Sequence, residues 1–238
     1  MSSDPIKDNS TPQTSLSSSS SSSSQSFPSG FEWIKLKAAY FVGSLNKEEE
    51  RKYEQEIARR KEVAECQRCE SFRDWNLAYS PTITFLRQEL RKVGGDIDRN
   101  HIVCHPCEGM EGGFNPSLGI MLCQNNLYTR SQVEDVISHE LIHAYDEMKF
   151  HVDWLNLKHQ ACSEIRASSL SGECRILNEF MKGYGGFTRH HQACVRRRAV
   201  TSVMGNPNCK TRQDAERAVD QVFDSCFNDT RPFEEIYR

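Results

Sequence analysis

The sequence predicts an α+β fold that is mostly helical, with a small antiparallel sheet, a helical C-terminal half and stabilising disulfide bonds. Charged and amphipathic stretches of helix-forming residues predict the helices, and two short β-prone runs between residues 101 and 128 predict the sheet. Ten cysteines, an even and high number, predict the disulfides. The chain has 238 residues, enough for one sizeable core or two small ones.

The first 30 residues differ from the rest in composition. They include the run SLSSSSSSSSQSFPSG, which has almost no apolar side chains to bury, so we expect residues 1–30 to be disordered. Before Phe27 the only basic residue is Lys7, set against Asp4 and Asp8, whereas a matrix-targeting presequence is rich in arginine and poor in acids. We therefore expect no cleavable presequence. The folded domain is expected to cover residues 31–238, after the serine-rich segment.

The next two stretches favour helices. FEWIKLKAAYFVGSL, at residues 31–45, mixes aromatic residues with two lysines, so it lies either in a membrane interface or as a helix packed on the domain. Residues 46–66 are highly charged and predict an exposed helix. Since no run approaches the roughly 18 consecutive apolar residues of a membrane span, we expect any membrane contact to be peripheral.

Charge gives little support for a nucleic-acid partner. The formal net charge is −3, which is close to neutral for a chain of this length. The run Arg196-Arg197-Arg198 is the main basic cluster, and we interpret it as a solvated helix face.

The segment after Pro81 predicts a helix followed by strands. TITFLRQELRKVGG places Ile83, Leu86 and Leu90 on one apolar stripe and ends in glycines. HIVCHPC and GIMLCQNNLY then read as short strands separated by the turn-rich run EGGFNPS. We expect the GIMLCQNN run to form an edge strand along which an extended peptide substrate adds.

The motif at residues 137–147, ISHELIHAYDE, contains His-Glu-x-x-His. On a helix, His139 and His143 lie one turn apart on the same face, where two imidazoles can bind one metal ion, with Glu140 beside them as general base. The pattern from Ser131 to Glu134 has the form of a capping box and predicts the start of this helix. Val133, Ile137 and Leu141 form an apolar stripe away from the histidines, which predicts that this side packs in the core.

After the motif the chain is predicted to be helical nearly to its end, with breaks near residues 182–187 and 205–208. This order, in which a strand is followed by a helix with the motif and then by further helices, is typical of zincin-type metallopeptidases. Such a site needs a third protein ligand and an open position for water. We favour Glu164, on the next predicted helix, as in gluzincins. Asp153, as in aspzincins, is the main alternative, and the weaker candidates are His151 and Glu173.

The chemistry expected of this site is peptide hydrolysis with one catalytic Zn²⁺. Zinc lowers the pKa of bound water and polarises the scissile carbonyl, while Glu140 takes the proton of the water and later delivers it to the leaving amine. The sequence does not distinguish among the candidates for stabilising the oxyanion, which are Tyr145, Tyr184, His190 and His191.

The cysteines allow two interpretations. The ten cysteines favour a disulfide framework formed in an oxidising compartment, without indicating which residues pair. Alternatively, the motifs Cys66-x-x-Cys69 and Cys104-x-x-Cys107 form a four-cysteine structural zinc site, which leaves the other six cysteines unexplained.

Four blocks carry a resemblance to a known family: SHELIHAYDEMKFHVDW, HQACSEIRASSLSGEC, HHQACVRRRA and VFDSCFNDTRPFE. Together, over about residues 60 to 237, the chain resembles the mitochondrial inner membrane metallopeptidases that mature subunit a of ATP synthase. The resemblance implies a peripheral protein on the intermembrane-space side, imported through oxidative folding, with the subunit a precursor as substrate. It also implies a chaperone role in assembly of the membrane sector, with His139 and His143 as ligands and Glu140 as base.

Two other functions remain open at this point. One is an assembly chaperone whose zinc centre is dispensable, and the other is a SprT-like DNA-repair metallopeptidase, also built on His-Glu-x-x-His. The absence of a strong basic signal and the high number of cysteines argue against a nuclear protein that binds DNA.

Overall fold

The computed structural model describes residues 30–174 and 190–234. The chain divides into two compact units, Met1–Gln55 and Glu56–Arg238. In the first unit, helix α1 (Gly30–Phe41) packs on the beginning of helix α2 (Lys47–Tyr79). Among the described residues, no helix is both long enough and apolar enough to cross a bilayer.

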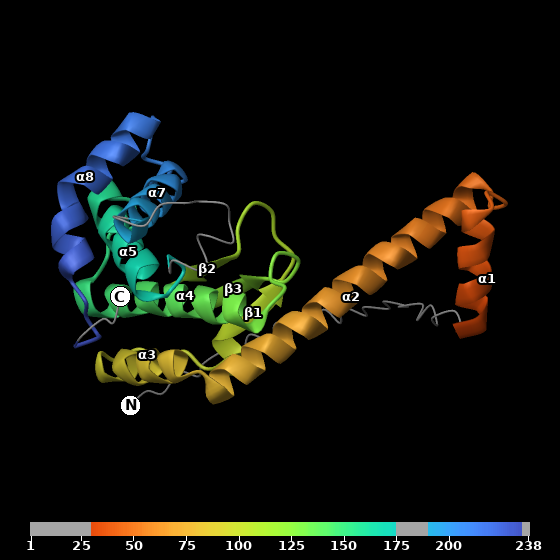
Figure 1. Ribbon diagram of the computed structural model, residues 1–238, viewed down its shortest axis with the longest axis horizontal. Helices are drawn as coiled ribbons and strands as arrows, with labels where there is room; N and C mark the ends of the chain where they lie inside the picture. The colour runs from red at the N-terminus through yellow and green to blue at the C-terminus, as the bar shows by residue number, and fades with distance from the viewer. Residues whose placement is uncertain (1–29, 175–189, 235–238) are drawn as a thin grey trace, which may run out of the picture. The chain divides into compact units, whose positions relative to one another are not determined.

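The second unit contains most of the fold (Figure 1). After the rest of α2 come α3 (Pro81–Lys92), the short 3-10 helix η1 (Arg99–His101) and three strands, followed by the helices that form the C-terminal half. These helices are α4 (Arg130–Phe150), α5 (Leu157–Leu170), α7 (His190–Met204) and α8 (Arg212–Asn228). The mostly helical α+β prediction is thus confirmed, as is the break at residues 205–208. The break expected at residues 182–187 lies outside the described residues.

The sheet differs from the expected antiparallel one because it is mixed. Its strands are β1 (Ile102–His105), β2 (Gly112–Asn115) and β3 (Gly119–Cys123), in the order β1-β3-β2. β2 and β3 are antiparallel, whereas β1 and β3 are parallel. The connection after β1 carries the chain to the far edge, where β2 forms, and the returning β3 fills the gap. The GIMLC run is therefore the central strand, and the prediction that it forms the edge strand was wrong.

Helix α4 is the central element of this unit. Its stripe of Val133, Ile137 and Leu141 is fully buried, as predicted, in a core shared with α3 and the sheet. A second cluster joins α5, α7 and α8. Helix α5 contributes to both clusters, with Ala167 in the first and Ile165 in the second. The face of α4 that carries the motif histidines is turned towards α5.

The start of α4 lies two residues before the predicted one. Thr129 is the N-cap: its hydroxyl accepts a hydrogen bond from the Gln132 N–H, and the Gln132 side chain accepts one from the Thr129 N–H. The predicted box at Ser131 does not form, because the Glu134 carboxylate accepts a hydrogen bond from the Ser80 hydroxyl at 2.6 Å instead.

Four disulfides cross-link the second unit. Cys69–Cys104 joins α2 to β1, and Cys162–Cys226 joins α5 to α8. The remaining two are Cys107–Cys123 and Cys174–Cys194. Because three of its four cysteines are in disulfides, the alternative four-cysteine zinc site was wrong. The framework is nevertheless incomplete, since Cys66 and Cys209 are free thiols.

Candidate metal centre

Two helices bring three metal-ligand side chains together. The Nε2 atoms of His139 and His143, on α4, lie 3.0 Å apart, and the Glu164 carboxylate on α5 lies 3.5 Å from each. Zn–N and Zn–O bonds of about 2.0–2.1 Å place neighbouring ligands of a tetrahedral zinc about 3.3 Å apart. The observed spacings match that value, and all three side chains are buried. The donor set therefore fits a zinc ion.

The partners of the two histidines orient both rings for binding. The Nδ1 of His143 lies 2.8 Å from the Ser163 hydroxyl, which donates to the Asp146 carboxylate at 3.0 Å. With its own proton committed to Asp146, the Ser163 oxygen accepts the Nδ1 proton of His143. The Nδ1 of His139 lies 3.1 Å from the Glu173 carboxylate. In His143, Nε2 is then left with a lone pair for a metal, and the contact of His139 Nδ1 with Glu173 leaves His139 Nε2 facing the same point.

The pKa values of two candidate ligands, His143 and Glu164, agree with this assignment. Burial lowers the pKa of His143 to about 4, so the ring is neutral, which is the form that binds a metal. For Glu164, burial alone would raise the pKa, but His143, His139 and the Ser202 hydroxyl outweigh it and lower the value to about 2. The Glu164 carboxylate is therefore ionised at neutral pH.

His139 occupies a different electrostatic environment. Burial opposes its protonation, but the carboxylates of Glu173, Glu164 and Glu140 raise its pKa well above the ordinary value. Glu173 also pairs with Arg198 at 2.7 Å. Three carboxylates around two imidazoles favour positive charge at this point, a requirement that a divalent cation meets.

Glu140 is placed to act as a base. Its side chain is buried, and burial raises its pKa to about 7, although the positive charge of His139 lowers it. The carboxylate lies beside Gly112 of β2, where a Cβ atom would stand 3.6 Å from it and only 2.4 Å from the Val136 side chain. Glycine at residue 112 thus allows the edge strand to pass close to the base.

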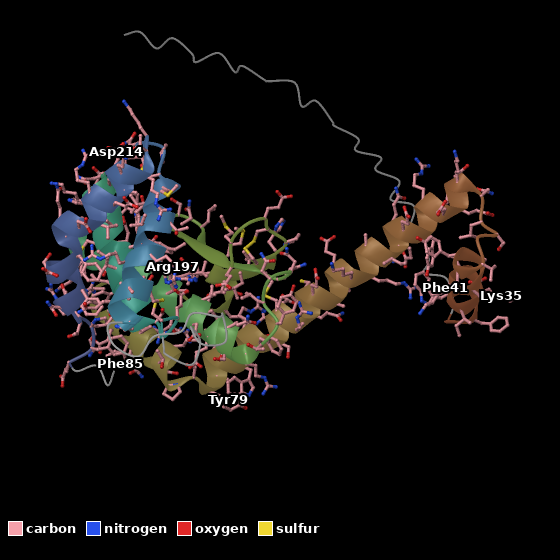
Figure 2. The ribbon with its side chains drawn as sticks, turned by 45° about the horizontal axis from the view of Figure 1, so that its top comes forward. Lys35, Phe41, Tyr79, Phe85, Arg197 and Asp214 are labelled. Atoms are coloured by element: carbon pink, nitrogen blue, oxygen red, sulfur yellow. A yellow bond between two sulfur atoms is a disulfide. The ribbon has the colours of Figure 1, made fainter. Side chains whose placement is uncertain are left out.

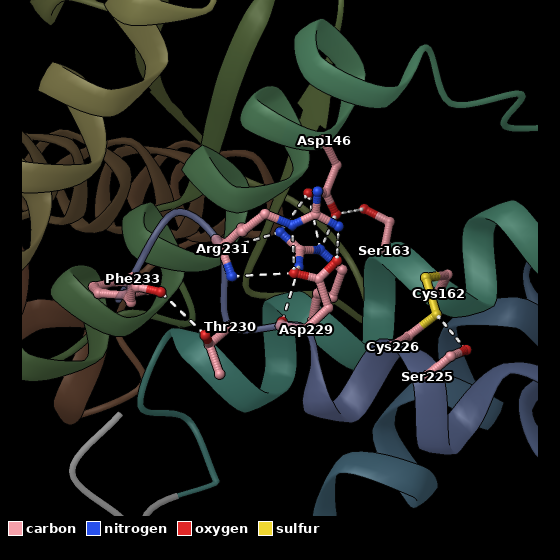
Figure 3. A network of polar contacts seen from close by, with 10 residues as sticks. Asp146, Cys162, Ser163, Ser225, Cys226, Asp229, Thr230, Arg231 and Phe233 are labelled. Carbon is pink, nitrogen blue, oxygen red and sulfur yellow. Dashed lines mark hydrogen bonds and ion pairs between the residues drawn. A yellow bond between two sulfur atoms is a disulfide. The ribbon is translucent and has the colours of Figure 1, made fainter. Parts of the chain in front are cut away.

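The Ser163–Asp146 pair continues into a buried network (Figure 3). Arg166 is ion-paired to Asp146 at 3.0 Å and to Asp229 at 2.7 Å, and it donates to the backbone carbonyls of Asp229 and Arg231. Its side chain and that of Asp146 are almost fully buried. Through this arginine, the segment after α8 is tied to the helix that carries the motif.

A cavity of about 880 Å³ opens onto the three candidate ligands and Glu140. One side is formed by the residues before β2 and by β2 itself, which is the edge strand of the sheet next to the site. Trp154, whose ring lies 5.5 Å from that of His143, and residues of α7 complete the lining. These α7 residues include Arg197 and Arg198, and because Arg198 also pairs with the buried Glu173, the interpretation of the arginine run as a solvated face was wrong for Arg198.

Several candidates from the sequence are placed elsewhere. Asp153 is exposed, and its carboxylate caps a turn by accepting the Leu155 N–H, while His151 is the exposed C-cap of α4. Glu173 contacts His139 on the ring nitrogen that faces away from the other ligands. Of the oxyanion candidates, Tyr145 packs in the core and His191 packs on Phe227, whereas Tyr184 and the side chain of His190 lie outside the described residues.

The site residues that sequence analysis missed are Ser163, Asp146, Trp154 and Arg198. Ser163 and Trp154 are close in sequence to Glu164 and Asp153, and Asp146 follows His143 by one helical turn. This spacing is the signal that could have found Asp146, because it places the carboxylate on the same side of α4 as His143.

A family model, described as the Peptidase M76 family, matches residues 67–234, a range that holds all four disulfides and the whole site. The chain belongs to the Peptidase M76 family. It is 52% identical to the "Mitochondrial inner membrane protease ATP23" of Yarrowia lipolytica, covering 90% of this chain and 86% of that protein. The protein of the same name from Saccharomyces cerevisiae is 52% identical, covering 88% of this chain and 96% of that protein. No solved structure matches this chain.

Proposed function

We propose that this protein is a zinc-dependent endopeptidase of the mitochondrial inner membrane. The observation that carries the proposal is the cluster of His139, His143 and Glu164, with Glu140 beside it, at one end of a cavity bounded by an edge strand. Membership of the M76 family and relatives named as mitochondrial inner membrane proteases support both the activity and the location. They also argue against a SprT-like DNA-repair peptidase.

In this proposal the chain's own residues bind the substrate and move the proton. A bound zinc ion supplies a Lewis acid that activates water and polarises a carbonyl group. Within residues 30–174 and 190–234, β2 has a strand on one side only, so we propose that its other edge takes an extended peptide, which would place a substrate backbone across the cavity near Glu140. Glu140 then accepts a proton from the attacking water and donates it to the leaving amine.

The substrate is proposed to be the precursor of ATP synthase subunit a, cleaved on the intermembrane-space side of the membrane. We further propose that the protein assists assembly of the ATP synthase membrane sector. Both statements rest on the family resemblance of the motif blocks, and four disulfides support an oxidising compartment.

Replacing the base tests the proposed activity. Glu140→Gln keeps a side chain of similar size but cannot accept the proton, so cleavage of a subunit a precursor peptide should fall by about 100-fold or more. Zinc content, measured on the same preparation, should stay at one per chain.

Replacing either histidine tests the metal centre. His139→Ala and His143→Ala should each lose the zinc. Full activity of the Glu140→Gln protein, or full zinc retention in either histidine variant, would remove the peptidase centre from the proposal.

The third ligand is tested by a matched pair of amides. Glu164→Gln should lose zinc on dialysis, with the affinity reduced by at least 10–100-fold, the range found even for partners of a ligand. Asp153→Asn should keep zinc, because that carboxylate caps an exposed turn. The reverse pattern would assign the ligand to Asp153, and zinc retention in both variants would exclude Glu164.

A further inference from the structure

Helix α1 has a defined place against the start of α2. Gly43, with φ of 66°, ends α1 in the left-handed conformation, and the Ser44 N–H returns to the Ala39 carbonyl. Asn46 begins α2: its side chain accepts hydrogen bonds from the N–H groups of Glu48 and Glu49. The two helices therefore form a hairpin whose turn is fixed by caps at both ends.

The inner face of α1 already has its partner. Trp33 and Tyr40 pack on Tyr53 of α2, with ring centroids 5.3 and 4.5 Å apart, and Tyr53 is only 2% exposed. These contacts lie within the first compact unit. They orient the opposite side of α1 outwards.

That opposite side is apolar. Phe31, Ile34, Phe41 and Val42 are 68%, 64%, 84% and 77% exposed. At 3.6 residues per turn Phe31, Ile34 and Phe41 lie on one side of α1, and Val42 follows the helix directly; we call these four residues the outer face of α1. Large exposed apolar residues are common singly, but a contiguous group of this kind marks a surface that binds a partner.

The charges on α1 indicate which partner. Lys35 and Lys37 fall on the two flanks of the outer face, and Lys35 Nζ lies 4.6 Å from the centre of the Phe31 ring. Lys35 and Phe41 are labelled in Figure 2. Glu32 is the one acidic residue of the helix. Apolar and aromatic side chains between flanking lysines are typical of a helix that lies in a membrane interface and attracts anionic lipids.

We propose that the outer face of α1 docks on a membrane surface that contains anionic phospholipids. With 12 residues, α1 is too short to span a bilayer and would lie in its plane. Docking of a second copy through the same face is disfavoured, since a self-complementary contact would bring the lysines of both copies together. This inference adds to the proposed inner-membrane location the helix that would contact the membrane. It rests on the proposed function only for which membrane is bound.

Vesicle flotation of the full chain tests this proposal. The protein should float with vesicles of phosphatidylcholine mixed with phosphatidylglycerol, and less with phosphatidylcholine alone. The combined variant Phe31→Ser, Ile34→Ser, Phe41→Ser and Val42→Ser should lose at least about tenfold in partitioning, since even one buried apolar side chain is worth about that factor. Replacing Lys35 and Lys37 by glutamate should abolish the preference for the anionic vesicles.

A matched control comes from the second unit. Leu118 and Leu155 are 79% and 59% exposed, so replacing both by serine removes exposed apolar surface elsewhere and should leave flotation unchanged. Zinc content and peptide cleavage in solution should be the same in all these variants, which separates failure of this inference from failure of the proposed function. Unchanged flotation of the four-serine variant would overturn the inference, as would a dimer that the same variant converts to a monomer.

Discussion

The two histidines of the candidate metal centre are held by groups that lie away from the point where their Nε2 atoms meet. Ser163 is the more informative of these, because it contacts His143 on one side and Asp146 on the other. The direction of the two hydrogen bonds is fixed by the carboxylate, which only accepts. Ser163 therefore determines which nitrogen of His143 carries the proton, and with it the availability of Nε2.

Removing the Ser163 hydroxyl should weaken metal binding without unfolding the protein. We expect Ser163→Ala to reduce zinc affinity by about 10-fold or more, the lower end of the range for partners of ligating histidines. Competition with a chromogenic chelator would measure the affinity. Ser168→Ala is the matched control, because Ser168 is on the same helix and fully buried, yet its hydroxyl has no hydrogen-bond partner in the part of the chain that the structure describes. Equal affinities in the two variants would contradict the role of Ser163.

The spacing of the motif was sufficient to predict the residues that α4 itself contributes to the cluster. Glu164 was also predicted, because a carboxylate on the next helix can return to the metal. The ion pair between Glu173 and Arg198 could not be predicted from the spacing of residues along the sequence. Their pairing depends on how the segment after α5 meets α7, and the run of arginines looks like any solvated helix face until that contact forms.

Among the helices, α5 has the widest set of roles. It carries Glu164 into the site, and through Arg166 it fixes the segment after α8. Arg166 and Asp146 are both almost fully buried, so their charges depend on each other. Burial raises the pKa of Asp146 to about 6, although Arg166 and Ser163 lower it.

This buried carboxyl should make stability depend on pH in a defined direction. Since the pKa of Asp146 in the folded protein is above its ordinary value of 3.8, the folded state holds the proton more tightly. The stability that this proton contributes is present below about pH 4 and is lost as the pH rises through about 6. The difference corresponds to about 3 kcal/mol.

Asp146→Asn removes this titration and leaves the other groups in place. The free energy of unfolding of the wild type, relative to that of the variant, should therefore fall between pH 4 and pH 7. Urea unfolding at several pH values would measure both proteins. A difference that stays constant, or that grows towards neutral pH, would show that Asp146 is not a carboxyl with a raised pKa.

The pairing of the strands and the start of α4 could not be predicted from local sequence patterns alone. The β-prone runs were visible, but the strand that pairs with β1 is set by the side of the sheet that the intervening β2 takes: here β2 lies at the far edge, so β1 pairs with the parallel β3. At the start of α4, two capping boxes were possible within three residues. The one at Thr129 forms because Glu134 is held by Ser80, a residue 54 positions away. Both outcomes depend on distant contacts that periodicity does not record.

The second unit as a whole is held by two clusters and four cross-links. One cluster surrounds α3, α4 and the sheet, and the other joins α5, α7 and α8. The candidate metal centre lies where α4 and α5 meet, in a part of the fold that both clusters already position. The Cys162–Cys226 disulfide closes a sequence separation of 64 residues, the longest of the four. By restricting the unfolded chain, a loop of that length stabilises the fold by about 4 kcal/mol.

From this arrangement we expect reduction to destabilise the protein more than removal of zinc. A reductant frees the unfolded chain of all four cross-links, whereas a chelator removes one ion from helices that their own cores hold in place. Thermal unfolding with reductant, with chelator and with neither would show the order. The double variant Cys66→Ser and Cys209→Ser is the control, because both thiols are free and their loss should leave the melting temperature unchanged. If the reductant has no effect, or if this variant melts as early as the reduced protein, the four pairings do not supply the stability, and the cysteines that matter include Cys66 or Cys209.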